Sequence, residues 1–132
     1  MKIVLASYFQ EENHGSGRKI GISPKKPTSE DAVECQFRFD PLDPGVLYWD
    51  YHKYKKDDPE AAGEAFVAGY RKQCADFVAD VKAKQANGQN IEDILPFKDG
   101  DTLLTWERKG NTSYRAIAAE YLRELGYEVE EN

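Results

Sequence analysis

The sequence predicts a single small α/β domain: a mainly parallel sheet with helices on both faces, in a Rossmann-like three-layer arrangement. Two observations support this prediction. The chain has 132 residues, which is the usual size of one domain. Short apolar runs typical of buried strands alternate along it with segments of helical periodicity. Such alternation is typical of βα units, whose strands run parallel.

The composition excludes several classes of protein. The chain is 40% hydrophobic and 32% charged, which is enough apolar material for one core, and no apolar run approaches the roughly 20 residues that span a bilayer. A net charge of −6 disfavours a protein that coats nucleic acid. Cys35 and Cys74 are too few for a disulfide framework. The N-terminal segment does not resemble a secretory signal, so we expect a cytoplasmic protein.

The first part of the chain is expected to contain two strands and an irregular region. Residues 2–9 form an apolar run without glycine or proline, which predicts a buried strand. The turn-rich segment 10–17 precedes a second short strand within residues 18–23. Four prolines within residues 24–44 disfavour a helix there, and the alternation of residues 35–39 predicts an extended segment.

The second part is expected to contain two helices and one or two strands. Apolar residues at three-to-four-residue spacing predict a long amphipathic helix over residues 59–84. Residues 91–99 are expected to form a linker, and residues 101–106 a buried strand. A second helix is predicted at residues 113–125, followed by a glycine cap, and residues 127–130 could add a terminal strand.

Ligand chemistry is expected where the predicted strand 101–106, a polar loop and the next helix follow one another. Ligands of open α/β sheets bind outside the carboxyl ends of the strands, and free N–H groups at a helix N-terminus attract anions. Glu107 is predicted as a catalytic proton acceptor, and Arg115 as a planar fork for phosphate or carboxylate. In the alternative interpretation, Glu107 and Arg115 pair with each other or with a neighbouring charge. The other ligand-binding residues predicted around this crevice are Ser23, Trp106, Ser113 and Tyr114.

At these residues the chain resembles the domain of unknown function 488 family. Members carry a strand ending in Leu-Leu-Cys-Tyr-Glu, a short loop and then Cys-His-Arg at a helix start; here residues 103–107 read Leu-Leu-Thr-Trp-Glu and residues 113–115 read Ser-Tyr-Arg. The resemblance extends in order and spacing over most of the chain, and it implies functional roles for Glu107, Arg115 and Ser23. The two cysteines and the histidine of the family pattern are replaced by Thr105, Ser113 and Tyr114. A thiolate nucleophile, an imidazole base or a Cys/His metal site of that pattern is therefore absent.

Two further segments are candidates for binding. Residues 16–27 carry no negative charge and four positive charges, which are on Arg18, Lys19, Lys25 and Lys26. Such a cluster favours a phosphate-bearing partner, and we expect Arg18 and Lys19 at the rim of the crevice. The alternative is a solvated basic loop, since the glycine spacing matches no phosphate-binding fingerprint.

The second candidate segment, residues 46–54, is rich in aromatic side chains that could stack on a base or a sugar ring: Tyr48, Trp49, Tyr51 and Tyr54. In the alternative interpretation, Trp49 and Tyr51 pack inward and the other rings cover the sheet edge. His14 and His52 have no partner at metal-ligand spacing, so both are expected on the surface.

These features predict a protein that binds a small anionic, phosphorylated or nucleotide-like ligand, with Glu107 assisting hydrolysis or proton transfer. No motif indicates a metal or another cofactor, and none fixes the oligomeric state. The alternative is a non-catalytic interaction protein, accessory to nucleic-acid metabolism or to host–phage conflict. The first hypothesis requires Glu107 and Arg115 to converge in a concave pocket, whereas the second requires an exposed apolar patch around Tyr48, Trp49 and Tyr51.

Overall fold

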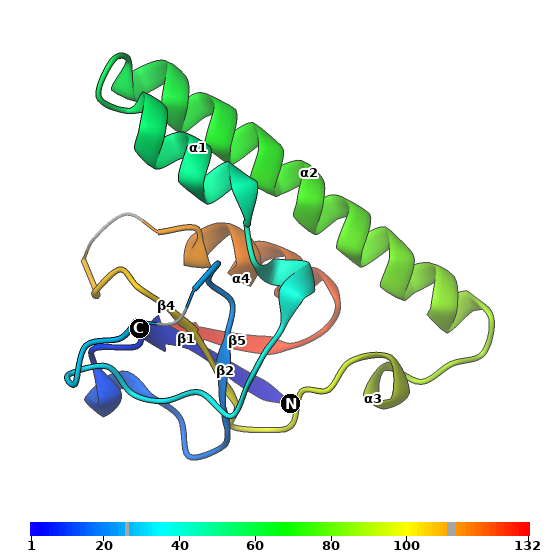
Figure 1. Ribbon diagram of the computed structural model, residues 1–132. Helices are drawn as coiled ribbons and strands as arrows, with labels where there is room; N and C mark the ends of the chain where they lie inside the picture. Colours follow the sequence, from blue (N-terminus) through cyan, green and yellow to red (C-terminus); the bar gives the residue numbers. More distant parts are fainter. Residues whose placement is uncertain (26, 111–112) are drawn as a thin grey trace.

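Five strands form one sheet in which every neighbouring pair is parallel (Figure 1). In spatial order they are β3 (Phe37–Arg38), β2 (Lys19–Gly21), β4 (Thr102–Thr105), β1 (Lys2–Ser7) and β5 (Glu128–Glu131). The computed structural model describes residues 1–25, 27–110 and 113–132. The predicted α/β class, a small domain on a parallel sheet, is confirmed.

β4 lies in the middle of the sheet, and all its residues are buried. Leu103 of β4 is in register with Leu5 of β1 on one side and with Ile20 of β2 on the other. Strands covered on both faces read as continuous apolar runs, which is why the sequence predicts β1 and β4 so closely. Because the strands are parallel, the carboxyl ends of β1, β2 and β4 meet at the same edge of the sheet.

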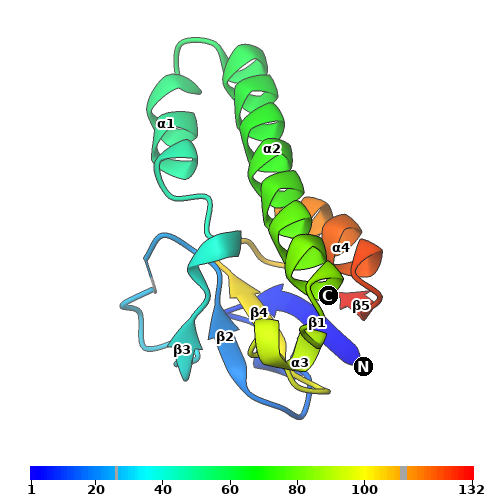
Figure 2. The same cartoon turned by 90° about the vertical axis from the view of Figure 1, so that its right-hand side faces the viewer.

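Helices pack over one face of the sheet (Figures 1 and 2). They are α1 (Val46–Tyr54), α2 (Pro59–Ala86), the short α3 (Ile91–Ile94) and α4 (Arg115–Glu124). The α2 helix begins at an N-cap, where the Asp58 side chain accepts a 3.1 Å hydrogen bond from the backbone N–H of Ala61. Buried side chains of α2 and α4, such as Cys74 and Leu122, form one core with the apolar side chains of the sheet. Among the described residues, no helix is both long and apolar enough to cross a membrane.

The opposite face of the sheet is covered by loops and a short 3-10 helix, η1 (Glu11–Asn13), rather than by an α-helix. Helices were predicted on both faces of the sheet, but on this face loops and η1 take the place of a helical layer. The connection from β1 to β2 spans only residues 8–18 and is rich in turn residues, and prolines interrupt the connection from β2 to β3. A Cβ on Gly15 would lie 2.4 Å from the Gly100 carbonyl oxygen, so this loop contacts the sheet through backbone.

Residues 46–54 form helix α1, which the sequence analysis did not predict. The α1 and α2 helices lie side by side as an antiparallel hairpin (Figure 1). Gly69 of α2 permits this close approach, because a Cβ there would lie 2.7 Å from Leu47 Cδ2. Trp49 is 51% exposed, which corrects the alternative that it packs inward, whereas Tyr51 is half-buried against Phe66.

Candidate ligand pocket at the carboxyl end of β4

A cavity of about 360 Å³ lies where the loop after β4 and the first turn of α4 meet helices α1 and α2. Its volume is within the range of roughly 300–1,000 Å³ that is typical of small-molecule sites. We call it the aromatic pocket. Most of its lining is aromatic or aliphatic, and few groups are polar. The lining residues are Tyr48, Tyr51, His52, Gly63, Phe66, Val67, Arg71, Glu107, Ser113, Tyr114 and Ile117.

Aromatic rings from three helical segments form the walls of this pocket. The Phe66 centroid lies 5.7 Å from that of Tyr51 and 6.1 Å from that of Tyr114. The centroids of Tyr48 and Tyr114 are 6.2 Å apart. The hydroxyl of Tyr114 is already used, because it donates a 2.8 Å hydrogen bond to the Ile22 carbonyl. Tyr48, Tyr51 and Phe66 are half-buried, so these rings offer apolar surface to a planar ligand, whereas Tyr114 is 4% exposed and packs behind them.

Glu107 contributes a carboxylate to the aromatic pocket. Ser113 Oγ donates a 2.7 Å hydrogen bond to its Oε1, and the Tyr48 hydroxyl donates a longer, 3.4 Å bond to its Oε2. Burial, and then the charge of Glu107, raise the pKa of Tyr48 to about 12, so Tyr48 stays protonated at neutral pH and acts as the donor. The structure thus places Glu107 and Ser113 together, as predicted for this crevice, with Tyr114 as part of the wall.

His52 lines the same pocket as a neutral imidazole. Its Nδ1 lies 2.9 Å from Lys55 Nζ, and an ammonium group has only donors, so Nδ1 accepts and the ring proton is on Nε2. Burial, and then the charge of Lys55, lower the pKa of His52. The ring is half-buried, with its centroid 4.4 Å from that of Tyr48. The expectation that His52 is a surface residue is therefore corrected.

His14 also differs from the surface position expected for it. The ring is half-buried, and its Nε2 lies 2.7 Å from the Ser7 carbonyl oxygen. A carbonyl only accepts, so the proton is on Nε2, and Nδ1 is a buried acceptor for which the described residues provide no partner. Burial is the largest cause of the lowered pKa of His14. This histidine holds the loop after β1 against the sheet edge.

Arg115 lies next to Glu107, but its guanidinium binds the backbone. Nη1 donates to the Glu107 carbonyl and to Thr105 Oγ1, and Nη2 donates a 3.4 Å bond to the Arg108 carbonyl. The side chains of Glu107 and Arg115 form no ion pair, so the alternative that they pair with each other is not realised. Burial lowers the pKa of Arg115. Arg115 therefore ties the loop after β4 to the start of α4 and positions Glu107, while its predicted contact with a ligand stays a prediction.

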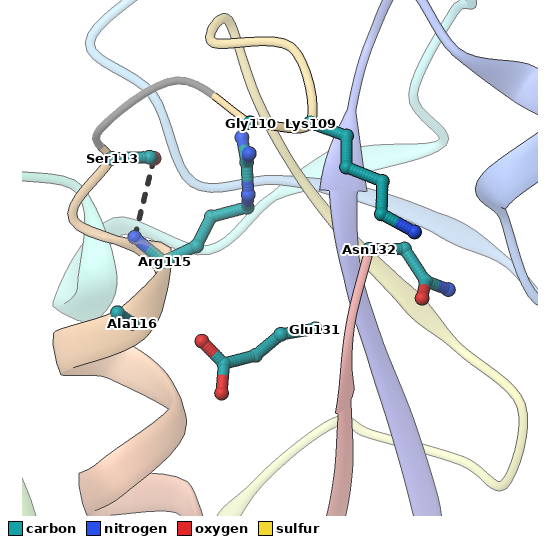
Figure 3. Close-up of a pocket in the computed structure, with 7 residues that line it drawn as sticks. All are labelled: Lys109, Gly110, Ser113, Arg115, Ala116, Glu131 and Asn132. Atoms are coloured by element: carbon teal, nitrogen blue, oxygen red, sulfur yellow. Dashed lines mark hydrogen bonds between the residues drawn. The ribbon is translucent and has the colours of Figure 1, made fainter.

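A second, smaller cavity of about 280 Å³ adjoins the aromatic pocket, and Ser113 lines both (Figure 3). Lys109 and Arg115 bring positive charge to it. Glu131 extends into it from β5 and pairs with Arg123 at 3.1 Å. The carboxylate of Glu131 opposes the binding of an anion here, so this cavity is not a purely basic site.

Ser23 and Trp106 lie near the carboxyl ends of β2 and β4 but line neither cavity. Ser23 Oγ donates a 2.9 Å hydrogen bond to the Lys25 carbonyl and lies 3.3 Å from the Tyr8 hydroxyl. Trp106 Nε1 donates a 2.6 Å bond to the same Lys25 carbonyl. Both residues thus hold the segment after β2, and their predicted ligand contacts stay predictions. Lys26 lies outside the described residues.

Arg18 and Lys19 lie at the opposite end of the sheet from Glu107. β2 begins at Lys19 and runs parallel to β4, so both residues are at the amino edge. There Arg18 Nη2 binds Asp101 Oδ2 at 2.7 Å, and Lys19 Nζ binds Glu11 Oε2 at 3.0 Å. The expectation that they line the rim of the crevice is corrected by the direction of the strand.

Several pocket residues were not identified as site residues from the sequence. Phe66 and Ile117 were expected as apolar helix faces, which they also are. Their participation depends on α1 packing against α2, and residues 46–54 were not expected to be helical. The dense aromatic run of that segment was the available signal, since more rings stand there than a sheet edge requires.

The chain matches no known family model, no curated protein and no solved structure. The resemblance to the domain of unknown function 488 family therefore stays a prediction, and function is argued from the geometry of the site.

Proposed function

We propose that the protein binds a small nucleotide-like ligand whose planar ring enters the aromatic pocket. The observation that carries the proposal is a carboxylate, held by Ser113 and Tyr48, beside walls formed by Phe66 and Tyr114. Planar heterocycles bind proteins by stacking on such rings and by hydrogen bonds at their edges. A mostly apolar pocket with few polar groups is the arrangement in which those groups set orientation.

The ring of the ligand, rather than its phosphate, is expected to supply most of the affinity. Lys109 and Arg115 bring positive charge to the adjoining cavity, but Glu131 shares that cavity. Part of the Arg115 guanidinium is also engaged within the protein, because Nη1 donates to the Glu107 carbonyl and to Thr105 Oγ1 and Nη2 donates to the Arg108 carbonyl. A nucleoside and its monophosphate should therefore bind with affinities within about tenfold of each other, which corresponds to about 1.4 kcal/mol.

Chemistry at this site would be proton transfer or hydrolysis with Glu107 as the proton acceptor. Glu107 is the carboxylate that lines the aromatic pocket, and Tyr48, with a pKa of about 12, is a donor to it. Ser113 holds the carboxylate in place at 2.7 Å. The role of Ser113 is thus hydrogen bonding at the helix start.

A thermal-shift screen tests the proposal, using nucleobases, nucleosides, nucleotides, sugar phosphates and inorganic phosphate. A ligand that binds only the folded state stabilises it by about 2.7 kcal/mol at a hundredfold excess over its Kd. Two exposed valines give a matched pair of variants. Val67→Glu adds a charged side chain at the pocket, whereas Val46→Glu adds one outside it.

We expect nucleosides and nucleotides to stabilise the wild type and Val46→Glu but not Val67→Glu. Stabilisation by inorganic phosphate alone, unaffected by Val67→Glu, would place the ligand elsewhere and contradict the proposal. Absence of any shift across the screen would also contradict it.

A second candidate function, protein interaction without catalysis, is favoured by the exposed apolar side chains of α1. Val46 is 72% exposed, and Trp49 and Tyr54 are each 51% exposed. Such side chains at one helix are typical of a docking surface for another protein. Capture of a partner from a lysate by the wild type, and its loss with Trp49→Ser, would support this function. Equal capture by both proteins would count against it.

A further inference from the structure

The hydrogen-bonding capacity of the Glu107 carboxylate is only partly used. A carboxylate has two oxygens with about four acceptor positions. Ser113 occupies one position on Oε1 at 2.7 Å, and Tyr48 approaches Oε2 at 3.4 Å, which is a long bond. Each oxygen therefore keeps an acceptor position, and the two oxygens lie side by side. A partner with two adjacent N–H donors matches this arrangement.

The described cations near the pocket are engaged with groups other than this carboxylate. The Arg71 guanidinium donates to both oxygens of Glu120, at 2.7 and 3.3 Å. Lys55 Nζ binds His52, and Arg115 binds backbone oxygens. Within the described parts of the chain, no salt bridge is found to Glu107, so a ligand that displaces water from this carboxylate should supply donors in its place.

His52 adds a donor to the same pocket. Because Nδ1 accepts from Lys55, the Nε2–H group is available, and no hydrogen bond to Nε2 is found among the described residues. The pocket thus combines an acceptor pair on Glu107 with one N–H donor, between aromatic walls. A complementary ring carries a carbonyl oxygen next to two adjacent N–H donors along one edge.

We infer that the ring recognised in the aromatic pocket is a guanine-type heterocycle. This inference rests on the proposed function and names its ligand class. The N1–H and N2–H groups of guanine would donate to the two oxygens of Glu107, and the O6 carbonyl would accept from His52 Nε2–H. Uracil and xanthine present carbonyl oxygens beside their N–H group, which a carboxylate repels, and adenine presents an acceptor at N1. Hypoxanthine retains N1–H and O6 but lacks the second donor.

Isothermal titration of the wild type with guanosine, inosine, adenosine and uridine tests the inference directly. Guanosine should bind at least tenfold more tightly than inosine, since a hydrogen bond to a charged group is lost, and adenosine and uridine should bind more weakly still. This ranking needs no variant, so it does not depend on whether a substituted protein folds.

Glu107→Gln gives a second test, because the amide keeps the shape but replaces one acceptor oxygen by a donor. We expect it to weaken guanosine binding at least tenfold and to abolish the preference for guanosine over adenosine. The matched control is Glu12→Gln, at an exposed position in η1 on the opposite face of the sheet. It should leave the affinity for guanosine and the preference for guanosine over adenosine unchanged.

The possible outcomes separate this inference from the proposed function. Binding of all nucleosides with affinities within about twofold would overturn the guanine assignment and leave the proposed function standing. Binding of no nucleoside would overturn both. Binding of tetramethylammonium with no binding of guanosine would show that the pocket selects positive charge through its rings, and would overturn the guanine assignment.

Discussion

Ser113 Oγ donates a 2.7 Å hydrogen bond to Glu107 Oε1, and the same Oγ accepts a 3.2 Å bond from the backbone N–H of Arg115. One hydroxyl thus joins Glu107, in the loop after β4, to the first residue of α4. Arg115 makes the reverse connection, from its side chain to the Glu107 carbonyl. The position of the pocket carboxylate therefore depends on the start of the following helix.

Removing the Ser113 hydroxyl should weaken ligand binding more than it weakens the fold. Ser113→Ala leaves Glu107 without its short hydrogen bond, which costs about 1 kcal/mol of ligand affinity, or roughly fivefold in Kd, measured by isothermal titration with guanosine. Ser29→Ala is the control, since Ser29 Oγ accepts a 3.2 Å bond from the N–H of Asp31 in an exposed loop. Unchanged guanosine affinity in Ser113→Ala would show that Glu107 does not contact the ligand.

Arg115 should be required for stability. Arg115→Ala removes a buried guanidinium that binds Thr105 and two carbonyls, and we expect the free energy of unfolding to fall by about 3 kcal/mol in urea denaturation. Arg115→Lys should recover little of this loss, because a single ammonium cannot reproduce the planar fork. Arg71→Lys, at an exposed ion pair, should change stability by less than about 1 kcal/mol. Arg115→Lys with wild-type stability would refute the positioning role.

The sequence predicted the strands and the two long helices because each has a periodic or continuous apolar pattern. It also predicted that Glu107 and Ser113 lie at one crevice, since a strand, loop and helix follow one another there. It did not predict helix α1, because aromatic residues in 46–54 fit a strand or a loop as well as a helix. The partners of Arg115 are backbone carbonyls, and no side-chain pattern in the sequence identifies them. Arg18 was misplaced because the basic residues of 16–27 were treated as one cluster, although the parallel strand expected within residues 18–23 runs from Arg18 at its amino end to Ser23 at its carboxyl end.

Asp101 should make the fold sensitive to acid. Burial raises its pKa, but hydrogen bonds from Arg18 and from the backbone N–H groups of Lys98 and Arg18 outweigh burial and lower the pKa below its usual 3.8. A carboxyl whose pKa is lower in the folded state contributes stability that is complete above about pH 4 and is lost as the pH falls through the folded pKa.

Asp101→Asn should therefore lower the free energy of unfolding by roughly 2–4 kcal/mol at pH 7, and the difference from wild type should shrink below about pH 4. Urea denaturation of the wild type and of Asp101→Asn between pH 7 and pH 3 measures this difference in the free energy of unfolding. The control is Asp50→Asn on α1, an exposed residue that should leave the pH dependence unchanged. A constant difference between Asp101→Asn and wild type at every pH would contradict the linkage.

Gly15 should tolerate no side chain. A Cβ there would lie 2.4 Å from the Gly100 carbonyl oxygen and 3.1 Å from Val4 Cγ2, so we expect Gly15→Ala to lower the melting temperature. Gly63→Ala is the matched substitution. Apart from the adjacent backbone of α2, no atom of the described residues lies within 4 Å of its Cβ position, and alanine favours a helix by up to about 1 kcal/mol over glycine. Thermal unfolding should rank Gly63→Ala at or above wild type and Gly15→Ala below it; the opposite order would contradict the packing of this loop on the sheet.

A crystal structure of the protein with guanosine would show whether the aromatic pocket holds a planar ring against Glu107. We expect the purine against the rings that line the pocket, with its N1 and N2 edge within about 3 Å of the Glu107 carboxylate. Density for the nucleoside at any other surface, with the aromatic pocket empty of it, would refute the proposed binding site.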